Sequence, residues 1–184
     1  MKKLLTVFAA AAFMLLTNSC DKAKDTINDL TEFDIDMSAN ANIPAATFTT
    51  VIDVTQPLEI ETPEIPTNAT EEFSKNKTSA DLISEIKVTR LTITTTAANM
   101  DYIKSISINI KTGSNKQRVA RKDVMPTGVN TVSLDLDDVN IKDYISKDKI
   151  SFQISALLNA GKIPNQAQEL KIDQRVRVKA TLIK

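Results

Sequence analysis

The chain has 184 residues, of which 23 are basic and 23 acidic, with one cysteine and neither histidine nor tryptophan. The absence of histidine excludes Ser-His-Asp and Cys-His catalysis and the histidine-containing zinc sites. Balanced charge argues against nucleic acid as a partner, because nucleic-acid-binding domains usually carry a basic excess. We expect no cofactor.

The N-terminus begins with Lys2 and Lys3 and continues with an apolar run over residues 4–16, in which Thr6 is the one polar residue. As a helix this run would extend over roughly 20 Å, whereas the hydrocarbon core of a bilayer is about 30 Å thick. A basic start followed by a short apolar run is typical of a signal peptide and not of a membrane-spanning helix. We therefore expect residues 1–19 to be a signal peptide.

A cysteine directly after such a run resembles the lipobox of bacterial envelope lipoproteins, which signal peptidase II cleaves. The resemblance implies that Cys20 is acylated through its thiol, that the chain is cut after Ser19, and that Leu16 is the upstream apolar residue. In the usual pattern the leucine lies three residues before the cysteine, whereas Leu16 lies four before it. The alternative is an ordinary secreted protein with a free thiol, which is a liability in an oxidising envelope. The resemblance covers the first 20 residues and implies a lipid anchor in the cell envelope. The outer membrane is the expected location, and the inner membrane is the alternative, because an acid after the cysteine, here Asp21, is a retention signal there in some bacteria.

Residues 20–30 are polar and charged and are expected to form a lipidated tether. Ten extended residues reach at most about 33 Å, enough to hold a domain away from the lipid headgroups. Asp25-Thr26-Ile27 matches a short O-glycosylation pattern reported for some bacterial envelopes, which makes Thr26 a candidate acceptor. Patterns of three residues arise often by chance, so Thr26 carries little weight.

From residue 31 onward, apolar and polar residues alternate as they do in half-buried antiparallel strands. The alternation predicts strands at 31–43, 48–54, 58–60, 86–95, 106–110, 117–124, 132–136, 150–158 and 170–182. A change of parity near Thr89–Arg90 predicts a bulge. Residues 68–85 predict a short helical crossover, with Thr78 and Asp81 as a capping box.

We therefore predict that residues 31–184 form a single all-β domain, a two-layer antiparallel β-sandwich. An immunoglobulin-like layout is our first choice. A transthyretin-like or other Greek-key sandwich is the alternative, because strand order cannot be read from one sequence.

Three groups of residues are candidates for chemistry. Asp135, Asp137 and Asp138 could supply oxygen ligands to a metal such as Ca²⁺, although alternation with leucines is more typical of a solvated strand face. Asp34 and Asp36 share a strand face and could act as general acid and base, as carboxylate pairs do in glycosidases.

The third group is a possible serine–lysine dyad, formed by Ser151 or Ser155 with Lys149. Such a dyad requires the two side chains to be buried together, which the sequence does not indicate.

Two groups are candidates for a contact surface. The first is a basic stripe on the last predicted strand, which is either a docking stripe for an anionic partner or a charged face that keeps the sheet soluble. Its members are Lys171, Arg175, Arg177 and Lys179. The second is the pair of tyrosines, Tyr102 and Tyr144, in short loops where a sandwich often binds partners. The alternative is that each tyrosine closes one end of the core.

These features favour a lipid-anchored cell-envelope protein with a non-enzymatic binding or structural role. The expected partners are the membrane, through the acyl chains, and an envelope protein or glycan. One alternative is a carboxylate-based hydrolase that acts on glycans, and another is an inhibitor or immunity-type module.

Overall fold

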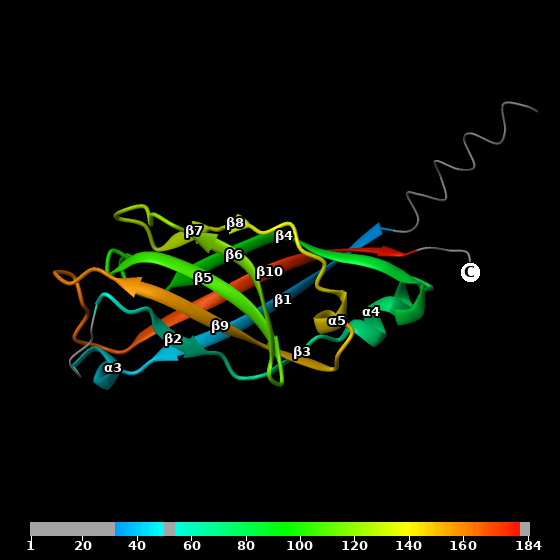
Figure 1. Cartoon of the computed structure of the whole chain (residues 1–184), viewed down its shortest axis with the longest axis horizontal. Helices are drawn as coiled ribbons and strands as arrows, with labels where there is room; N and C mark the ends of the chain where they lie inside the picture. Colours follow the sequence, from blue (N-terminus) through cyan, green and yellow to red (C-terminus); the bar gives the residue numbers. More distant parts are fainter. Residues whose placement is uncertain (1–31, 50–53, 181–184) are drawn as a thin grey trace, which may run out of the picture. The chain divides into compact units, whose positions relative to one another are not determined.

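The computed structural model describes residues 32–49 and 54–180, which form two antiparallel β-sheets packed face to face (Figure 1). The first sheet has the strand order β1-β10-β4-β7, and the second has the order β2-β9-β5-β6-β8, with β3 also paired to β9. The strands are β1 (Glu32–Ile43), β2 (Leu58–Glu61), β3 (Ile65–Pro66), β4 (Ile83–Thr95), β5 (Ile103–Thr112), β6 (Asn115–Lys122), β7 (Thr131–Ser133), β8 (Asp135–Leu136), β9 (Lys149–Leu158) and β10 (Gln168–Ala180). The predicted all-β, two-layer sandwich is confirmed.

The strand order identifies the layout of the sandwich. β2 and β3 both pair with β9 and act as one interrupted strand, whereas β7 and β8 are consecutive parts of a strand that passes from the first sheet to the second. Counted in this way, the described residues form eight strands, in the order 1-8-3-6 in one sheet and 2-7-4-5 in the other, where the end of strand 6 also pairs with strand 5. This is the order of a jelly roll, a Greek-key sandwich. Our first choice, an immunoglobulin-like layout, is corrected, because that fold places its first strand beside its second.

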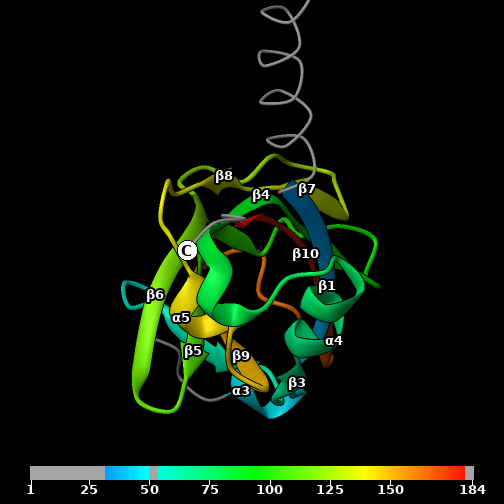
Figure 2. The ribbon, with the colours of Figure 1, turned by 90° about the vertical axis from the view of Figure 1, so that its right-hand side faces the viewer.

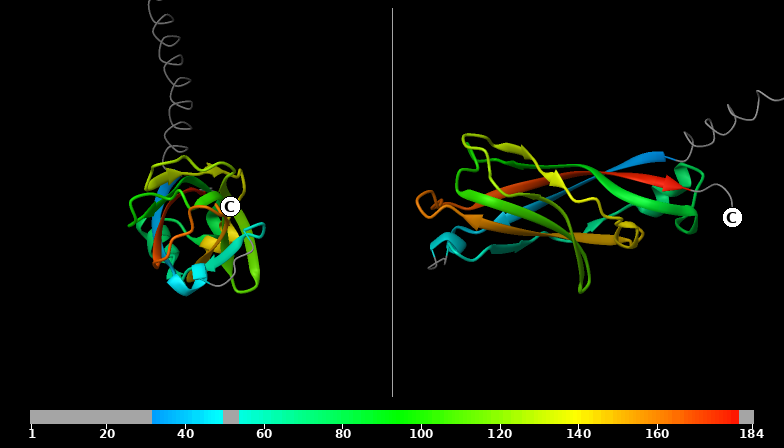
Figure 3. Two further views of the ribbon diagram at one scale, coloured as in Figure 1. Left: turned by 90° about the vertical axis from the view of Figure 1, so that its left-hand side faces the viewer. Right: turned by 45° about the horizontal axis from the view of Figure 1, so that its top comes forward.

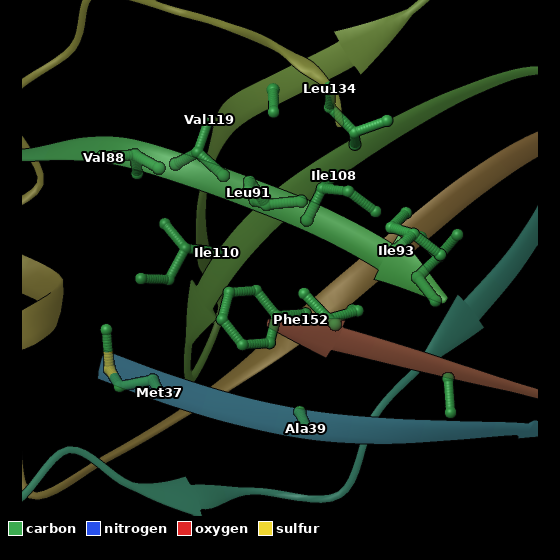
Figure 4. Packing of buried hydrophobic residues seen from close by; sticks show 14 of the residues in the cluster. Met37, Ala39, Val88, Leu91, Ile93, Ile108, Ile110, Val119, Leu134 and Phe152 are labelled. Atoms are coloured by element: carbon green, nitrogen blue, oxygen red, sulfur yellow. The ribbon is translucent and has the colours of Figure 1, made fainter. Parts of the chain in front are cut away.

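The core lies between the sheets and is built from the inward positions of each strand. β1 alternates strictly between exposed and buried residues from Asp34 to Ile43, and β10 does so over most of its length. Figure 4 shows inward side chains from both sheets, among them Met37 and Ala39 of β1 and Phe152 of β9. Phe152 is one of the largest fully buried side chains of the described residues. The period of two in the sequence therefore gives the core its two faces.

The two lateral sides of the sandwich differ. On one side, residues 131–136 cross from the first sheet to the second, and buried Leu134 donates its backbone N–H to the carbonyl of Leu91. On the other side, β1 ends the first sheet, β2 and β3 end the second, and no strand of the described residues joins them. We call this the open side. Helix α4 (Ala69–Lys75) lies beside β1 there, with Phe73 edge-on to Phe33 at 6.2 Å between ring centroids (Figure 2).

The local features predicted near the helical crossover and the bulge are confirmed. Helix α4 and the 3₁₀ turn η1 (Ala80–Leu82) occupy the predicted crossover. The pairing of β4 with β10 shifts at Thr89, so that Thr89 and Arg90 are both exposed. The predicted capping box is not formed, because Ser79 is the N-cap of η1 and its hydroxyl donates to Asp81.

The beginning of one predicted strand, 48–54, is helical in the structure, and residues 50–53 of that prediction lie outside the described residues. Residues 45–49 form α3 (Ala45–Thr49), which begins directly after Pro44, where alternation of Phe48 with polar residues predicted a strand. Phe48 is nevertheless buried and packs edge-on against Tyr102 at 6.0 Å between ring centroids. A single apolar residue does not distinguish one helical turn from a short strand, because both can direct it to the core.

Gln174 is an uncharged polar side chain placed inside the core. It lies midway along β10, is 1% exposed, and pairs across the ladder with Leu91 of β4. Neither its Nε2 nor its Oε1 has a hydrogen-bond partner among the described residues. An unpaired buried polar group costs about 1–3 kcal/mol, so this amide destabilises the folded domain.

Replacing Gln174 by methionine is therefore expected to stabilise the protein. Gln174→Met keeps the length and approximate volume of the side chain and removes the unpaired amide, so the free energy of unfolding should rise by about 1–3 kcal/mol. The measurement is chemical denaturation followed by circular dichroism. Gln166→Met, at an exposed position, is the control and should change stability by less than about 0.5 kcal/mol. A loss of stability in Gln174→Met would mean that the amide is satisfied in solution.

Candidate functional site

The outer face of the first sheet brings together two groups that the sequence suggested separately. β1 and β10 are neighbours, and their outward carboxylates and guanidinium groups form two bidentate pairs. Arg175 donates through Nε and Nη2 to the two carboxylate oxygens of Asp36, at 2.8 Å each. Arg177 donates to Asp34 in the same way, at 3.0 and 3.4 Å. We call these four residues the Arg–Asp cluster.

A third guanidinium group approaches the cluster from β4. Arg90 lies 3.5 Å from the carboxylate of Asp36, and the bulge at Thr89 places it on the outer face. The hydrogen bonds from Arg175 lower the pKa of Asp36 below its ordinary value. Desolvation opposes this in part, and the charges of Arg175 and Arg90 add to the lowering. Asp36 is therefore ionised at neutral pH.

An open hollow of about 370 Å³ lies beside this cluster on the outer face. The residues whose side chains point outward around it are Asp36, Ser38, Arg90, Thr92 and Asp173. The lining is polar and contains both charges. The hollow therefore offers hydrogen bonds to a polar ligand but no strong electrostatic potential of one sign.

The geometry does not suit the acid–base role considered for Asp34 and Asp36. A general acid of a glycosidase needs a raised pKa so that it is protonated at working pH. Asp36 has a lowered pKa, and each carboxylate accepts two hydrogen bonds from its own arginine. The chemistry of this pair is structural ion pairing across two strands.

The basic stripe on β10 is also paired along its length. In addition to the two arginines of the cluster, Lys171 lies 2.9 Å from Asp173, and Lys179 lies 3.4 Å from Glu85. Each of the four cations thus has a carboxylate within ion-pair distance. This arrangement fits the charged, soluble face of our second interpretation better than a docking stripe of unpaired charge.

The metal candidates Asp135, Asp137 and Asp138 diverge. Each is bound by a different cation: Lys122 at 3.0 Å, Arg118 at 2.7 Å and Lys87 at 2.7 Å, respectively. No group of three or more potential metal ligands occurs in the part of the chain that the structure describes. The carboxylates serve three separate ion pairs.

The two tyrosines do not form a shared contact surface. Tyr102 is 4% exposed, and burial raises its pKa to about 12, an effect that nearby Thr95 only partly offsets. Tyr144 lies in α5 (Lys142–Ile145) and is half-buried against the core. α3, which contacts Tyr102, and α5 lie at opposite ends of the sheets (Figure 3). The interpretation of Tyr102 as a contact residue is corrected: it closes one end of the core.

The candidate serine–lysine dyads are not assembled. Ser151 donates to Glu61 at 3.0 Å, and Ser155 donates to Glu59 at 2.6 Å. Lys149 is exposed at the start of β9. Both hydroxyls therefore serve pairing between β9 and β2.

Sequence reasoning missed Asp101, which joins the loops at one end of the sandwich. Its carboxylate accepts from the backbone N–H of Gly128 at 2.6 Å and from Lys162 at 3.0 Å, and its carbonyl accepts from Asn159. The hydrogen bond from the backbone N–H of Gly128 lowers the pKa of Asp101 most, and the hydrogen bond from Lys162 lowers it further. Asn99, whose Oδ1 accepts from the N–H of Asp101, is the turn signal that could have directed attention here.

Sequence reasoning also missed a hollow along the open side. It has a volume of about 520 Å³ and follows residues 34–38 of β1, with residues 65–68 and Glu72 as the opposite wall. The hollow thus runs beside the backbone of a strand at the end of its sheet.

Cys20 and Thr26 lie outside the described residues, so acylation and glycosylation stay predictions from the sequence. No helix in the described ranges is long and apolar enough to cross a membrane.

Comparisons with known proteins give only distant similarity. No family model matches the chain, and no curated protein matches it significantly. Among solved structures, the chain is similar to a chain of Desmodium yellow mottle tymovirus, with 10% identity, a TM-score of 0.30, and 83% of each chain covered. It is also similar to a chain of turnip yellow mosaic virus, with 9% identity, a TM-score of 0.28, and coverage of 84% of this chain and 98% of that one. At these TM-scores neither likeness supports an argument about function.

The Arg–Asp cluster is expected to give the protein a pH-dependent stability. Because the pKa of Asp36 is lowered on folding, its contribution is complete above the ordinary value of about 3.8 and is lost as the pH falls through the folded-state pKa. Asp36→Asn should therefore reduce the free energy of unfolding at pH 7 by up to about 1 kcal/mol, since the pair is largely exposed. The difference from the unsubstituted protein should become smaller as the pH falls below about 3.8.

The measurement is urea denaturation at pH 7 and at pH 2.5, in low and high salt. Asp148→Asn is the control, because Asp148 is exposed and forms no ion pair with the described residues. An Asp36→Asn difference that is the same at both pH values would contradict the expected role of the carboxylate.

Proposed function

We propose that this protein is a lipid-anchored component of the bacterial cell envelope that has a non-enzymatic binding or structural role. Its anchor is an acylated Cys20, expected in the outer membrane, and its β-sandwich is held away from the lipid by residues 20–30. The partner is an envelope protein or glycan. The proposal of a non-enzymatic role rests on one observation: the candidate catalytic side chains are engaged in ion pairs and hydrogen bonds between strands.

The anchor is supported by the order of features in the first 20 residues. A basic start, a short apolar run and a cysteine directly after small polar residues resemble a lipobox. Burial of acyl methylenes contributes about 0.8 kcal/mol each, and two or three chains hold a protein stably on a bilayer. The lone cysteine has a use under this proposal, whereas a free thiol in an oxidising compartment has none.

The non-enzymatic role is supported by the pairing of the polar side chains. Asp34 and Asp36 are bound by Arg177 and Arg175, and Ser151 is bound by Glu61. A nucleophile or general acid needs a neighbouring group that activates it or a shifted pKa that suits proton transfer. These pairs supply neither: the hydrogen bonds from Arg175 lower the pKa of Asp36, Arg177 engages both oxygens of Asp34, and the Ser151 hydroxyl donates to Glu61.

Substitution of the cysteine tests the anchor. In the native host, Cys20→Ser should abolish incorporation of a fatty-acid label and move the protein from the membrane fraction to the soluble fraction. Ser19→Ala keeps a small residue before the expected cut and should retain both the label and the membrane location. A free thiol at Cys20 in the mass spectrum of the mature protein would refute the anchor.

Incubation with glycans tests the absence of catalysis. The purified protein should release no product from a panel of envelope glycans, because Asp36 is not protonated at neutral pH. Asp34→Asn and Asp36→Asn should leave this result unchanged. Turnover by the unsubstituted protein that either variant abolishes would favour the hydrolase instead.

A further inference from the structure

The open side of the sandwich exposes one long strand edge. β1 has twelve residues and pairs with β10, and no strand of the described residues pairs with its other edge. The remaining outer strands are much shorter: β2 has four residues, β7 has three, and β3 and β8 have two each. Pro57, Pro63 and Pro66 also interrupt or flank β2 and β3. Proteins protect exposed sheet edges with short strands, prolines, lysines or a covering helix or loop. β1 is long and contains neither proline nor lysine, Pro44 follows its last residue, and α4 and residues 65–68 lie beside its first half.

The charges on β1 do not protect this edge either. A strand that carries Asp34 and Asp36 would repel another acidic strand if these charges were unbalanced. Both are instead paired with arginines of β10 within the same chain. The Arg–Asp cluster therefore neutralises the edge and leaves it able to accept a further strand.

The sequence of β1 is complementary to itself when it is read in the antiparallel direction. On the outer face, acidic residues precede uncharged hydrogen-bonding residues: Asp34 and Asp36, then Ser38, Asn40 and Asn42. On the inner face, the large residues Phe33, Ile35 and Met37 precede the small residues Ala39 and Ala41, and Ile43 ends the strand. Both gradients change near Met37. A second copy of the strand that runs in the opposite direction would place uncharged residues opposite the acidic ones and small residues opposite the large ones.

We propose that β1 pairs with β1 of a second copy of this chain, antiparallel about a two-fold axis at Met37, so that the two first sheets become one continuous sheet. In this register Asp36 faces Ser38 of the second copy, and Asp34 faces Asn40. Each carboxylate then meets a hydroxyl or amide donor, and the lone pairs not used by its arginine accept the hydrogen bond. On the inner face Ile35 lies opposite Ala39 of the second copy.

Residues that face each other across a strand pair have side chains on the same face of the sheet, and this requirement limits the possible registers. A two-fold axis normal to the sheet pairs residues of equal parity, so the axis passes through a residue and not between two. An axis at Asp36 would set two carboxylates directly against each other, and an axis at Ile35 would set Asp34 against Asp36. Like charges opposite each other destabilise a strand pair. The axis at Met37 avoids both arrangements.

The hollow on the open side leaves part of the β1 edge accessible at the proposed axis. It follows residues 34–38, a stretch that includes Met37, and its volume is about 520 Å³. An added strand lies about 4.8 Å from its neighbour in the sheet. The proposal does not depend on the lipid anchor, because every residue that carries it belongs to the sandwich.

Sedimentation equilibrium of the full chain in a density-matched detergent tests the proposal. The protein should show a monomer–dimer equilibrium. Asn40→Asp places a carboxylate opposite Asp34 of the second copy, twice by symmetry, and should raise the dimer Kd about tenfold. The double variant D34N/N40D exchanges the two groups and should return the Kd to within about threefold of the original.

Asn115→Asp is the matched control. It adds the same charge at an exposed position at the start of β6, which belongs to the other sheet, and should leave the Kd unchanged. Circular dichroism confirms that each variant is folded at the temperature of measurement. A monomer at all concentrations, or a dimer whose Kd Asn40→Asp does not change, overturns the proposal. Failure of the double variant to recover overturns the register.

Hydrogen exchange gives a second readout that needs no substitution. The backbone N–H groups of residues 34–40 that point away from β10 should exchange more slowly as protein concentration rises through the dimer Kd, while those of β7 should not respond. Exchange in β1 that is independent of concentration also overturns the proposal. Loss of the Cys20 anchor with intact strand pairing would refute the proposed function and leave this inference standing.

Discussion

The pairing of the first strand with the last is the constraint on which the first sheet depends. The two ion pairs of the Arg–Asp cluster join residues that are 139 and 143 positions apart in the sequence. A slip of β1 by one residue would turn its apolar set outward and its carboxylates into the core, away from both guanidinium groups. Exposed ion pairs contribute at most about 1 kcal/mol each, so their main effect is to select the register. Burial of the inward side chains supplies most of the stability.

This constraint also determines where the sandwich is open. β10 lies between β1 and β4, so the first strand is left as the outer member of its sheet. The opposite side is closed by a single strand that crosses between the sheets at Leu134. An edge of twelve residues is therefore a consequence of the jelly-roll order and not of any local feature of β1. Because the strands that join here are so distant in sequence, the sheet also belongs to the topologies that fold slowly.

Local patterns predicted most of the elements, because periodicity and turn residues act over a few positions. The strands, the bulge at Thr89 and the helical crossover follow from such patterns, whereas α3 does not, because one turn with a single apolar residue fits two structures. The strand order and the Arg–Asp cluster could not be predicted in this way. Asp34 was considered as half of a catalytic pair and Arg177 as part of a docking stripe, and both interpretations lacked the information that β1 and β10 are neighbours. Tyr102 was misjudged for a related reason, since a residue in a loop can still face the core.

The structural and catalytic uses of Asp36 exclude each other. A general acid must be protonated before it reacts, and a protonated Asp36 would lose its charge-assisted hydrogen bonds to Arg175. Arg175 and Arg90 would then face each other on neighbouring strands with their shared counter-charge removed. The pKa of Asp36 is lowered because the contacts that fix the register of β1 also stabilise the ionised form of its carboxylate. A strand that is held in register by the ionised form of Asp36 is therefore poorly suited to proton transfer through that carboxylate.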